Sequence, residues 1–255
     1  MKLLVLGSGT STGVPRIGND WGACDPNNPK NRRTRVSIIV ESDEGQRVLI
    51  DTSTDLRQQL LDNCVDSIDA VFWTHDHADH CHGIDDLRVM RYGRDGPMPG
   101  YAAEETVRRL RQRFGYVFAG QHGYPTIVTL DTLDRIRIAA GMRVDWCIVP
   151  HGPARSTAYR FSSGTRSIGY ATDISEITNE LVDVMHDVDL LVVDCLRRDP
   201  HPTHAHLGMA LDLAKRTGAK RTVLTHLDKS MDYDAVQAET PDDVEPAFDG
   251  MVIAL

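Results

Sequence analysis

The sequence predicts an α/β protein in which two β-sheets pack face to face and helices cover them. Apolar, β-rich segments dominate the start of each half of the chain, and stretches with helical periodicity lie between and after them. The two halves repeat this layout roughly, and the most polar residues directly follow apolar strands. Because α/β proteins keep their sites at the C-terminal ends of strands, these polar residues mark the expected site. We expect residues 1–255 to form a single domain, because no composition shift marks a linker.

The composition is that of an ordinary globular protein, with 41% hydrophobic and 25% charged residues. No apolar run approaches the roughly 20 residues that a spanning helix needs. The apolar stretch after Met1 and Lys2 is shorter than the ~7–15 residues of a secretory signal. We therefore expect a cytoplasmic protein with no membrane partner. The 5 cysteines are scattered and contain no C-x-x-C pair, which argues against a disulfide framework.

The formal net charge of −9 disfavours a protein that binds nucleic acid without regard to sequence. It does not exclude a phosphate substrate, because bound divalent ions would dominate the local field. Arginines cluster at Arg32, Arg33 and Arg35 and again within residues 108–113. In the second cluster apolar residues recur at helical spacing, so we interpret those arginines as a solvated helix face.

In chain order, the first half begins with a strand and a loop at 7–15 that is rich in glycine and hydroxyl groups. The backbone N–H groups of this loop could bind an anion, although an ordinary loop at the end of a strand would explain the glycines and hydroxyl groups equally well. Residues 16–34 lack apolar periodicity and are expected to form an extended surface loop. A short helix is expected at 56–61, and the two glycines and two prolines of 96–100 are expected to break the chain. The strands expected in this half cover residues 2–6, 36–41, 47–50 and 68–73.

The second half repeats the pattern of strands followed by helices. Helices are expected at 103–114, 175–186 and 204–217, the last of them ending at Gly218 as a C-terminal glycine should. Residues 251–254 can close a sheet edge. The other strands expected in this half cover residues 135–140, 143–149, 158–162, 167–171, 190–193 and 221–225.

The run from Thr74 to Gly83 holds four histidines and two aspartates directly after an apolar strand. Neutral imidazole and carboxylate are the usual ligands of divalent transition metals, and such a cluster could not be buried cheaply without a cation. Asp51, at the end of an earlier strand, could orient a metal-ligating histidine or cap the following helix, and we favour the first role. A solvated turn is the competing interpretation of the run.

Three further polar residues stand just after apolar strands: His151, Asp173 and His226. Each would lie on the same rim of the sheets as the run at 74–83, so side chains distant in sequence could converge there. Any one of them alone is more often an ordinary loop residue than a ligand. Together with the run, they predict a metal site.

The motif His75-x-His77-x-Asp79-His80, followed by those three residues, resembles the binuclear metallo-β-lactamase-fold hydrolases over nearly the full chain. The resemblance implies an αββα sandwich and two divalent ions, Zn²⁺ or Mn²⁺. Asp76 and His82 are then supporting residues. The ligands that the resemblance implies are His75, His77 and His151 for one ion, Asp79, His80 and His226 for the other, and Asp173 bridging the pair.

Within that superfamily, the loop at 7–15 and the extension at 81–88 resemble the PhnP cyclic-phosphate phosphodiesterases more than the lactamases. A small phosphodiester or nucleotide-like substrate follows as the expectation. In such phosphodiesterases a histidine upstream of the last ligand faces the phosphate, and His204 occupies that place. We assign catalytic roles to His204 and to the ligand Asp79. His201 and His206 are weaker candidates, better explained as an exposed helix start.

The chain also departs from that subfamily. Cys24 stands alone where those phosphodiesterases cluster cysteines, and Lys229 follows His226 where a further histidine would be needed, so we expect no structural zinc. The protruding arm by which tRNA-processing relatives hold tRNA has no counterpart, so no large nucleic acid is expected as a partner. A homodimer is left open.

The resemblance implies that two adjacent cations would lower the pKa of a bridging water, giving a hydroxide that attacks phosphorus. His204 would stabilise the developing charge or protonate the departing oxygen. Two alternatives remain: a thioester hydrolase that uses the same metal cradle, and a protein that binds metal or nucleotide without turnover.

Overall fold

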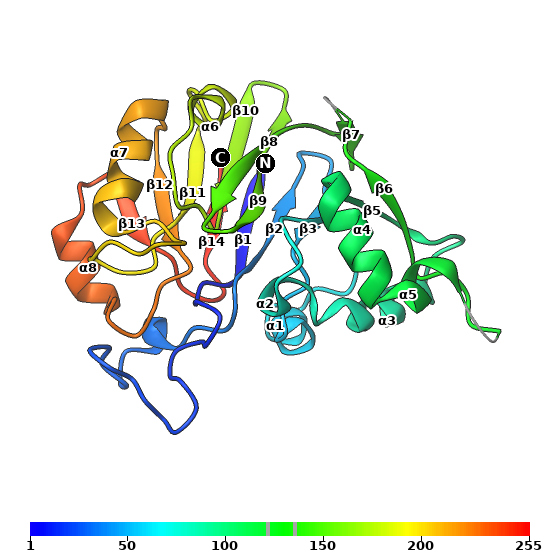
Figure 1. Cartoon of the computed structure of the whole chain (residues 1–255), viewed down its shortest axis with the longest axis horizontal. Helices are drawn as coiled ribbons and strands as arrows, with labels where there is room; N and C mark the ends of the chain where they lie inside the picture. Colours follow the sequence, from blue (N-terminus) through cyan, green and yellow to red (C-terminus); the bar gives the residue numbers. More distant parts are fainter. Residues whose placement is uncertain (121–122, 135–136) are drawn as a thin grey trace.

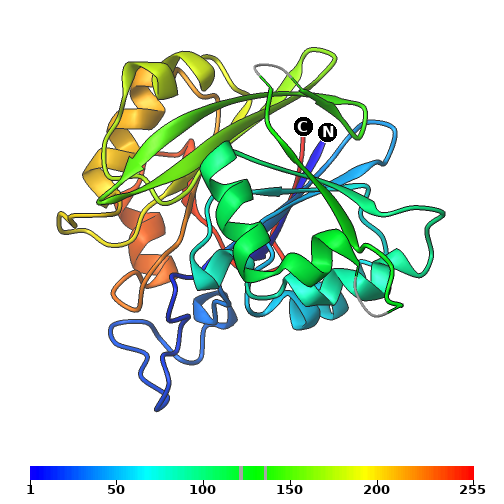
Figure 2. The same ribbon diagram turned by 45° about the vertical axis from the view of Figure 1, so that its right-hand side comes forward.

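The chain folds into two β-sheets that face each other and are covered by helices on their outer sides (Figures 1 and 2). The computed structural model describes residues 1–120, 123–134 and 137–255. The predicted αββα sandwich is confirmed. Of the predicted strand at 135–140, residues 135 and 136 lie outside the described residues.

The first sheet has the strand order β14-β1-β2-β3-β4-β5-β6. Its first part is antiparallel, and from β3 onward the strands run parallel. The predicted edge strand at the C-terminus is confirmed, because β14 pairs with β1. The strands of this sheet are β1 (Lys2–Gly7), β2 (Ser37–Glu41), β3 (Arg47–Ile50), β4 (Ala70–Trp73), β5 (Met98–Ala102), β6 (Val128–Thr132) and β14 (Val252–Ala254).

The second sheet has the order β13-β12-β11-β10-β9-β8-β7 and is dominated by the long hairpin β8–β9. From β10 to β13 its strands run parallel. Its strands are β7 (Arg137–Ala139), β8 (Met142–His151), β9 (Ala154–Ser163), β10 (Arg166–Ala171), β11 (Leu190–Asp194), β12 (Thr222–Thr225) and β13 (Val244–Pro246).

The helices divide between the two sheets. The first five follow strands of the first sheet and the last three cover the second sheet (Figure 1). None of the helices in the described part of the chain is long and apolar enough to cross a membrane. The helices are α1 (Leu56–Asp62), α2 (Ala78–Cys81), α3 (Leu87–Arg91), α4 (Glu104–Arg113), α5 (Gly115–Ala119), α6 (Asn179–Val184), α7 (Leu207–Thr217) and α8 (Tyr233–Glu239), with 3₁₀ turns at Pro29–Asn31 and Ile84–Asp86.

Alternation along the strands builds three apolar layers. In β4, Phe72 faces the core between the sheets, whereas Val71 and Trp73 face the helices of the first sheet. A strand buried on both faces reads as a continuous apolar run, which is why β4 was visible in the sequence. A third cluster joins the outer face of the second sheet to α6, α7 and α8. The layers hold the strand ends rigidly, and the site lies at those ends.

The expectation that residues 96–100 break the chain is wrong, because Met98–Ala102 forms the buried strand β5. Pro99 is compatible with a central strand here because of the register. Met98 N–H donates to Ile127 toward β6, so the position of Pro99 faces β4, where pairing starts only at Gly100. Helix α6 is also shorter than predicted, because Thr178 caps its N-terminus by accepting from Leu181 N–H.

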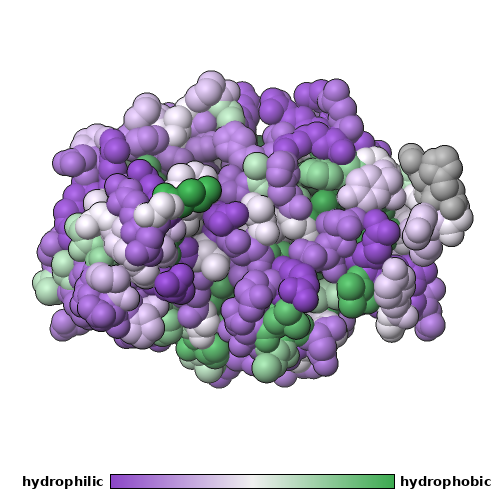
Figure 3. All heavy atoms as spheres, turned by 90° about the horizontal axis from the view of Figure 1, so that it is seen from below, coloured by the Kyte–Doolittle hydropathy of each residue, from purple (hydrophilic) through white to green (hydrophobic). Residues whose placement is uncertain are grey.

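The segment at 16–34 is largely irregular, as predicted, and projects from the body as a dark-blue loop in Figure 1. Arg33 within it is buried and donates to the Asp228 carbonyl and the Asn31 side chain. The surface seen from below in Figure 3 is mostly hydrophilic, and its hydrophobic residues lie in small separate groups.

Candidate metal centre

The structure brings all the sequence-predicted ligands to one rim of the sandwich, where strands of both sheets end. The first sheet contributes the loop after β4, and the second sheet contributes the ends of β8, β10 and β12. The residues that meet there are His75, His77, Asp79, His80, His151, Asp173, His204 and His226.

Three histidines form one side of the cluster. His75, His77 and His151 offer nitrogen atoms within 4.8 Å of one another. Their ring centroids are 4.4 Å apart for His75 and His77 and 5.1 Å apart for His77 and His151. His77 is the exposed member, and the other two are buried. A three-histidine arrangement of this kind is a common ligand set for one divalent ion.

The other side combines a carboxylate with two histidines. Asp79, His80 and His226 also offer ligand atoms within 4.8 Å of one another. Asp173 lies between the two sides: its Oδ2 is 3.2 Å from His80 Nε2, and its Oδ1 is 3.5 Å from His151 Nε2. This position is compatible with the bridging role that the sequence resemblance implies.

Fixed partners hold two of these histidines by the nitrogen that faces away from the cluster. His80 Nδ1 lies 2.7 Å from Asp51 Oδ2, and His151 Nδ1 lies 2.6 Å from the Thr203 carbonyl. Each contact leaves Nε2 directed into the cluster. The contact of Asp51 with His80 agrees with the role favoured for Asp51, and the residue at the N-terminus of α1 is Asp55 instead.

Asp194 is a functional candidate that the sequence reasoning missed. It is buried at the end of β11, and its Oδ2 accepts from Ile174 N–H, Ala205 N–H and His204 Nδ1. Its Oδ1 lies 3.8 Å from His226 Nδ1. The signal was present in the sequence, because Asp194 follows an apolar strand just as Asp173 does.

The buried polar atoms of the cluster indicate that it fits metal ions. His75 Nε2, His80 Nε2 and His226 Nε2 are buried and form no hydrogen bond of normal geometry, although carboxylate oxygens lie 3.2 Å from His80 Nε2 and 3.7 Å from His226 Nε2. Buried polar atoms are nearly always paired, so three unpaired nitrogens in one place point to a group that completes them. Imidazole nitrogen with carboxylate oxygen is a donor set that suits zinc, manganese or iron.

The electrostatics of the cluster agree with a cation. Burial opposes the charged form of His80, but Asp173, Asp79 and Asp51 outweigh burial and raise the pKa of His80 well above its ordinary value. Burial likewise opposes the charged form of His226, yet the neighbouring carboxylates raise its pKa to about 9. The carboxylates thus draw protons to His80 and His226, whereas burial lowers the pKa values of His75 and His151. Bound cations would neutralise the negative charge of the carboxylates.

The backbone is strained where the strands deliver these side chains. Asp51, Asp173 and His226 adopt positive φ angles of 65°, 56° and 61°. Residues other than glycine rarely occupy this region, and the surrounding structure must impose it. Each of the three follows a strand closely, so the turn redirects its side chain into the cluster.

His204 lies beside the predicted ligands, as the sequence analysis expected. Its ring stacks on that of His226 at 4.7 Å between centroids, and its side chain is 13% exposed. His201 is a closer neighbour than expected, with its ring 5.3 Å from that of His204. His206 occupies the residue before α7, in agreement with its interpretation as a helix start.

The arginines at 108–113 lie on a largely exposed helix face, as predicted, but two of them also contact the loop that carries the predicted ligands. Arg113 donates to the Asp76 carbonyl and lies 2.6 Å from His82 Nε2 through its other nitrogen. Arg109 Nη1 donates to Asp76 Oδ1 at 3.3 Å. Helix α4 therefore braces the loop that carries His75, and these contacts are compatible with the supporting roles expected for Asp76 and His82.

The glycine-rich loop at 7–15 packs against the site loops and uses several of its N–H groups in hydrogen bonds within the protein. Gly9 N–H donates to the Thr34 carbonyl, and Thr10 N–H donates to the Leu227 carbonyl. A Cβ on Gly7 would lie 2.1 Å from the Arg35 carbonyl oxygen, so this close approach requires glycine. The loop supports the segment next to His226, and the idea that it cradles an anion gains no support.

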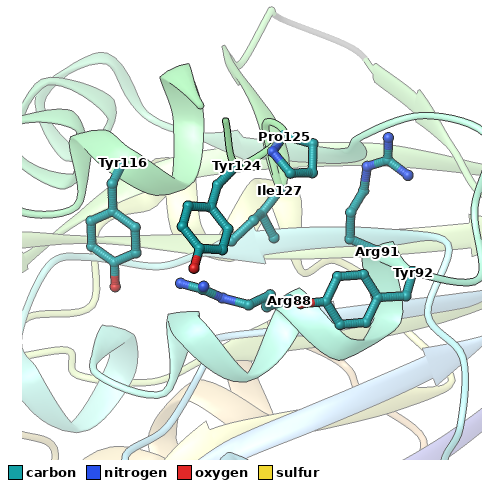
Figure 4. A pocket seen from close by; sticks show the side chains of 7 residues that line it. All are labelled: Arg88, Arg91, Tyr92, Tyr116, Tyr124, Pro125 and Ile127. Atoms are coloured by element: carbon teal, nitrogen blue, oxygen red, sulfur yellow. The ribbon is translucent and has the colours of Figure 1, made fainter. Parts of the chain in front are cut away.

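A separate cavity of about 300 Å³ lies among α3, α5 and the chain before β6 (Figure 4). Its arginines already have partners: Arg88 donates to Asp85, and Arg91 donates to the Thr126 and Arg94 carbonyls. None of its lining residues belongs to the histidine and aspartate groups described above. The chemistry therefore lies at the strand ends and not in this cavity.

Comparisons with known proteins agree with this geometry. The family model described as a beta-lactamase superfamily domain matches residues 46–227. A crystal structure of a diphosphatase from the PhnP family has 36% sequence identity and a TM-score of 0.89, covering 99% of this chain and 96% of that one.

Two further solved structures show the same fold. Zn²⁺-bound PqqB from Methylobacterium extorquens has 20% identity and a TM-score of 0.80, with full coverage (100%) of both chains. The short form of human tRNase Z has 20% identity and a TM-score of 0.75, covering 100% of this chain and 99% of that one.

A protein of Porphyromonas gingivalis named octanoyltransferase is 33% identical over 257 residues, which is 98% of this chain but 51% of that protein. This chain thus spans about half the length of that relative, whose name describes a protein with a second, unmatched half. The family match across most of the chain, together with the sandwich and the histidine and aspartate cluster, shows that this chain belongs to the β-lactamase superfamily and has the metallo-β-lactamase fold.

Proposed function

We propose that this chain is a hydrolase that uses two divalent metal ions to cleave a phosphodiester or diphosphate bond in a small molecule. The observation that carries the proposal is the convergence of three unpaired buried nitrogens, on His75, His80 and His226, with the carboxylates of Asp79 and Asp173. The 36% identity to a PhnP-family diphosphatase supports the phosphate chemistry.

The two sides of the cluster would each hold one ion. When bound, such ions lower the pKa of water and neutralise charge on phosphoryl oxygens. Asp173 is 2% exposed and faces both sides, whereas Asp79 is 13% exposed and stands nearer the opening. The proposed ligands are His75, His77 and His151 for one ion, Asp79, His80 and His226 for the other, and Asp173 between them.

His204 is the proposed acid for the departing oxygen. Asp194 Oδ2 lies 3.2 Å from His204 Nδ1, and this contact fixes the proton on that nitrogen and leaves Nε2 for the substrate. In this role the Nε2–H group of His204 would donate to the departing oxygen and stabilise its developing negative charge. A proton transfer of this kind contributes typically ~10²–10⁴-fold to the rate.

The direct test is metal analysis followed by activity measurements. The purified protein should bind two equivalents of Zn²⁺ or Mn²⁺ per chain, and the loaded form should hydrolyse cyclic phosphates, nucleotide diesters or diphosphates. Loading should also raise the unfolding temperature relative to the chelator-treated protein. A fully loaded protein that turns over none of these compounds would contradict the proposal.

The role of His204 is tested by His204→Ala with His206→Ala as the matched control. We expect His204→Ala to keep both ions and lose about 10²-fold or more in turnover. The control should keep its turnover, because His206 precedes α7 and forms no part of the metal groups. Unchanged turnover of the fully loaded His204→Ala protein would remove this residue from the mechanism.

Acyl chemistry is the second candidate, and the octanoyltransferase name of one relative favours it. The same cluster could act on a thioester carbonyl, because polarising a carbonyl needs the same ions. A panel of acyl thioesters separates the two functions. Turnover of thioesters alone would replace the phosphate proposal with this one.

A further inference from the structure

A groove of about 340 Å³ opens beside the metal centre, between the N-terminus of α4 and the β8–β9 hairpin. It adjoins the centre at two points. Asp76 lines the groove and stands between His75 and His77, and Ala154 lines it and pairs in register with His151. A substituent of a substrate bound at the metal centre would therefore extend into this groove.

The floor of the groove is apolar and comes from one strand face. Trp146 and Ile148 lie two residues apart on β8 and point to the same side. Both are half-buried, and Trp146 packs against the core between the sheets. An aromatic ring fixed in this way offers a stacking surface to a flat ligand.

A buried hydroxyl in the groove calls for a polar partner. Thr157 is 1% exposed, and its Oγ1 forms no hydrogen bond of normal geometry with the described residues, although it interacts with the Tyr159 side chain. Its backbone N–H is bound to the Thr74 carbonyl, next to His75, so its position relative to the centre is fixed. The polar edge of a ligand could pair with this hydroxyl and remove the cost of leaving it buried and unpaired.

One cation at the groove is free to bind an anion. Arg109 is already held by Glu105 and Asp76. Arg155 is exposed, and its side chain forms no hydrogen bond or ion pair with the described residues, 1–120, 123–134 and 137–255. It pairs in register with Pro150, next to His151, so its guanidinium can reach an anionic group close to the centre.

From these contacts we infer that the groove binds the base of a nucleoside phosphate, with the base on Trp146 and Ile148 and a phosphate near Arg155. A flat heterocycle fits the apolar floor and has a polar edge for Thr157, whereas an alkyl chain would leave that hydroxyl unpaired. The inference rests on the proposed function, because it places the scissile phosphate at the metal centre. It names the substrate class: small nucleoside phosphodiesters or diphosphates.

Equilibrium binding tests the inference without turnover. Titration calorimetry on the metal-loaded protein compares the four 5′-ribonucleoside monophosphates with ribose 5-phosphate, which carries the same phosphate and sugar without a base. We expect at least one nucleotide to bind about tenfold more tightly than ribose 5-phosphate, the size of effect that base stacking produces.

Three variants locate the effect. Trp146→Leu and Thr157→Val should each reduce the preference for the nucleotide severalfold and leave ribose 5-phosphate binding unchanged. Arg155→Ala should weaken both ligands about threefold to tenfold, because it removes a phosphate contact. Arg108→Ala, on an exposed part of α4 outside the groove, is the matched control and should change neither.

The outcomes separate this inference from the proposed function. The inference would be overturned if all four nucleotides and ribose 5-phosphate bind equally. It would also be overturned if a base preference survives both Trp146→Leu and Thr157→Val, even if diesters are hydrolysed. A base preference that these variants remove, in a protein that hydrolyses no diester, would support the groove and overturn the proposed hydrolysis.

Discussion

Two buried aspartates, Asp51 from the first sheet and Asp194 from the second, contact histidines of the metal centre in different ways. Asp51 uses both carboxylate oxygens: Oδ1 accepts from Thr74 N–H, and Oδ2 accepts from the Thr74 hydroxyl and contacts His80. Asp194 concentrates its contacts on Oδ2, and its Oδ1 is buried without a partner. The first aspartate fixes one ligand, whereas the second ties two loop backbones to His204.

This difference indicates that position 51 requires a carboxylate, whereas one oxygen atom at position 194 keeps most of the contacts. Either orientation of an amide at position 51 would set its NH₂ group against a donor, on Thr74 or on His80. Asp194 Oδ1 lies 3.8 Å from His226 Nδ1, beyond hydrogen-bond distance, so an amide at position 194 that keeps its oxygen in place of Oδ2 would take no hydrogen bond from a proposed ligand. The first sheet's ligand is therefore more sensitive to its aspartate.

The largest effect on the centre is expected for Asp51→Asn. Loss of the His80 contact should weaken metal binding by about 10–100-fold, as is usual when the partner of a ligating histidine is removed. Competition against a chromophoric chelator measures this. The control is Asp55→Asn, since Asp55 accepts from Arg35 N–H and has no contact with the centre. Equal metal affinity of the two variants would contradict the role given to Asp51.

A smaller effect is expected for Asp194→Asn. Turnover should fall about threefold to tenfold, because His204 Nδ1 exchanges a charged acceptor for a neutral one, while the amide oxygen keeps the loop contacts. Steady-state kinetics at measured metal occupancy checks this. A loss of metal as large as that of Asp51→Asn would erase the distinction between the two aspartates.

Arg113→Ala should have a still smaller effect. Arg113 holds Asp76 and His82 from α4, but its side chain is 33% exposed, so solvent screens the interaction. We expect metal affinity to fall about twofold to fivefold. Arg108→Ala serves as the control, and the chelator competition used for Asp51→Asn applies here too. Identical affinity of both variants would leave α4 without a bracing role.

Asp249 provides a buried aspartate that no histidine contacts, and its effect should fall on stability and not on metal binding. Burial raises the pKa of Asp249 to about 6, although Ser8 and Thr34 donate to it. A raised pKa means that the folded state holds the proton more tightly than the unfolded state, whose pKa is near 3.8. The stabilisation that Asp249 provides to the folded state is therefore complete below pH 3.8 and is lost as the pH rises through about 6.

Urea unfolding across that window measures the effect. The free energy of unfolding of the native protein, minus that of Asp249→Asn, should decrease by up to about 3 kcal/mol between pH 4 and pH 7. Subtracting the variant removes the titration of all other groups. A difference that stays flat or rises with pH would show that the four donors hold Asp249 charged throughout.

Local pattern made much of the fold predictable. Strand β4 was recognisable because both of its faces are buried, and α4 and α7 because one face of each is apolar. Strand β5 was not, because its glycines and prolines signal a turn and only the register against β4 makes them compatible with a strand. The role of Arg113 was also hidden, because an amphipathic helix does not show which loop lies beside its polar face.

The sequence by itself determined which residue types gather at the centre, since His75 to His80 are six consecutive residues in which metal-ligating types are dense. It also placed His151, Asp173 and His226 at strand ends. Only the tertiary structure decided how these residues share two sides, that Asp194 supports His204, and that a groove with Trp146 and Arg155 adjoins the centre. The types of ligand residue can be recognised from short stretches of the chain. Their supporting residues and the groove form only where segments distant in sequence meet.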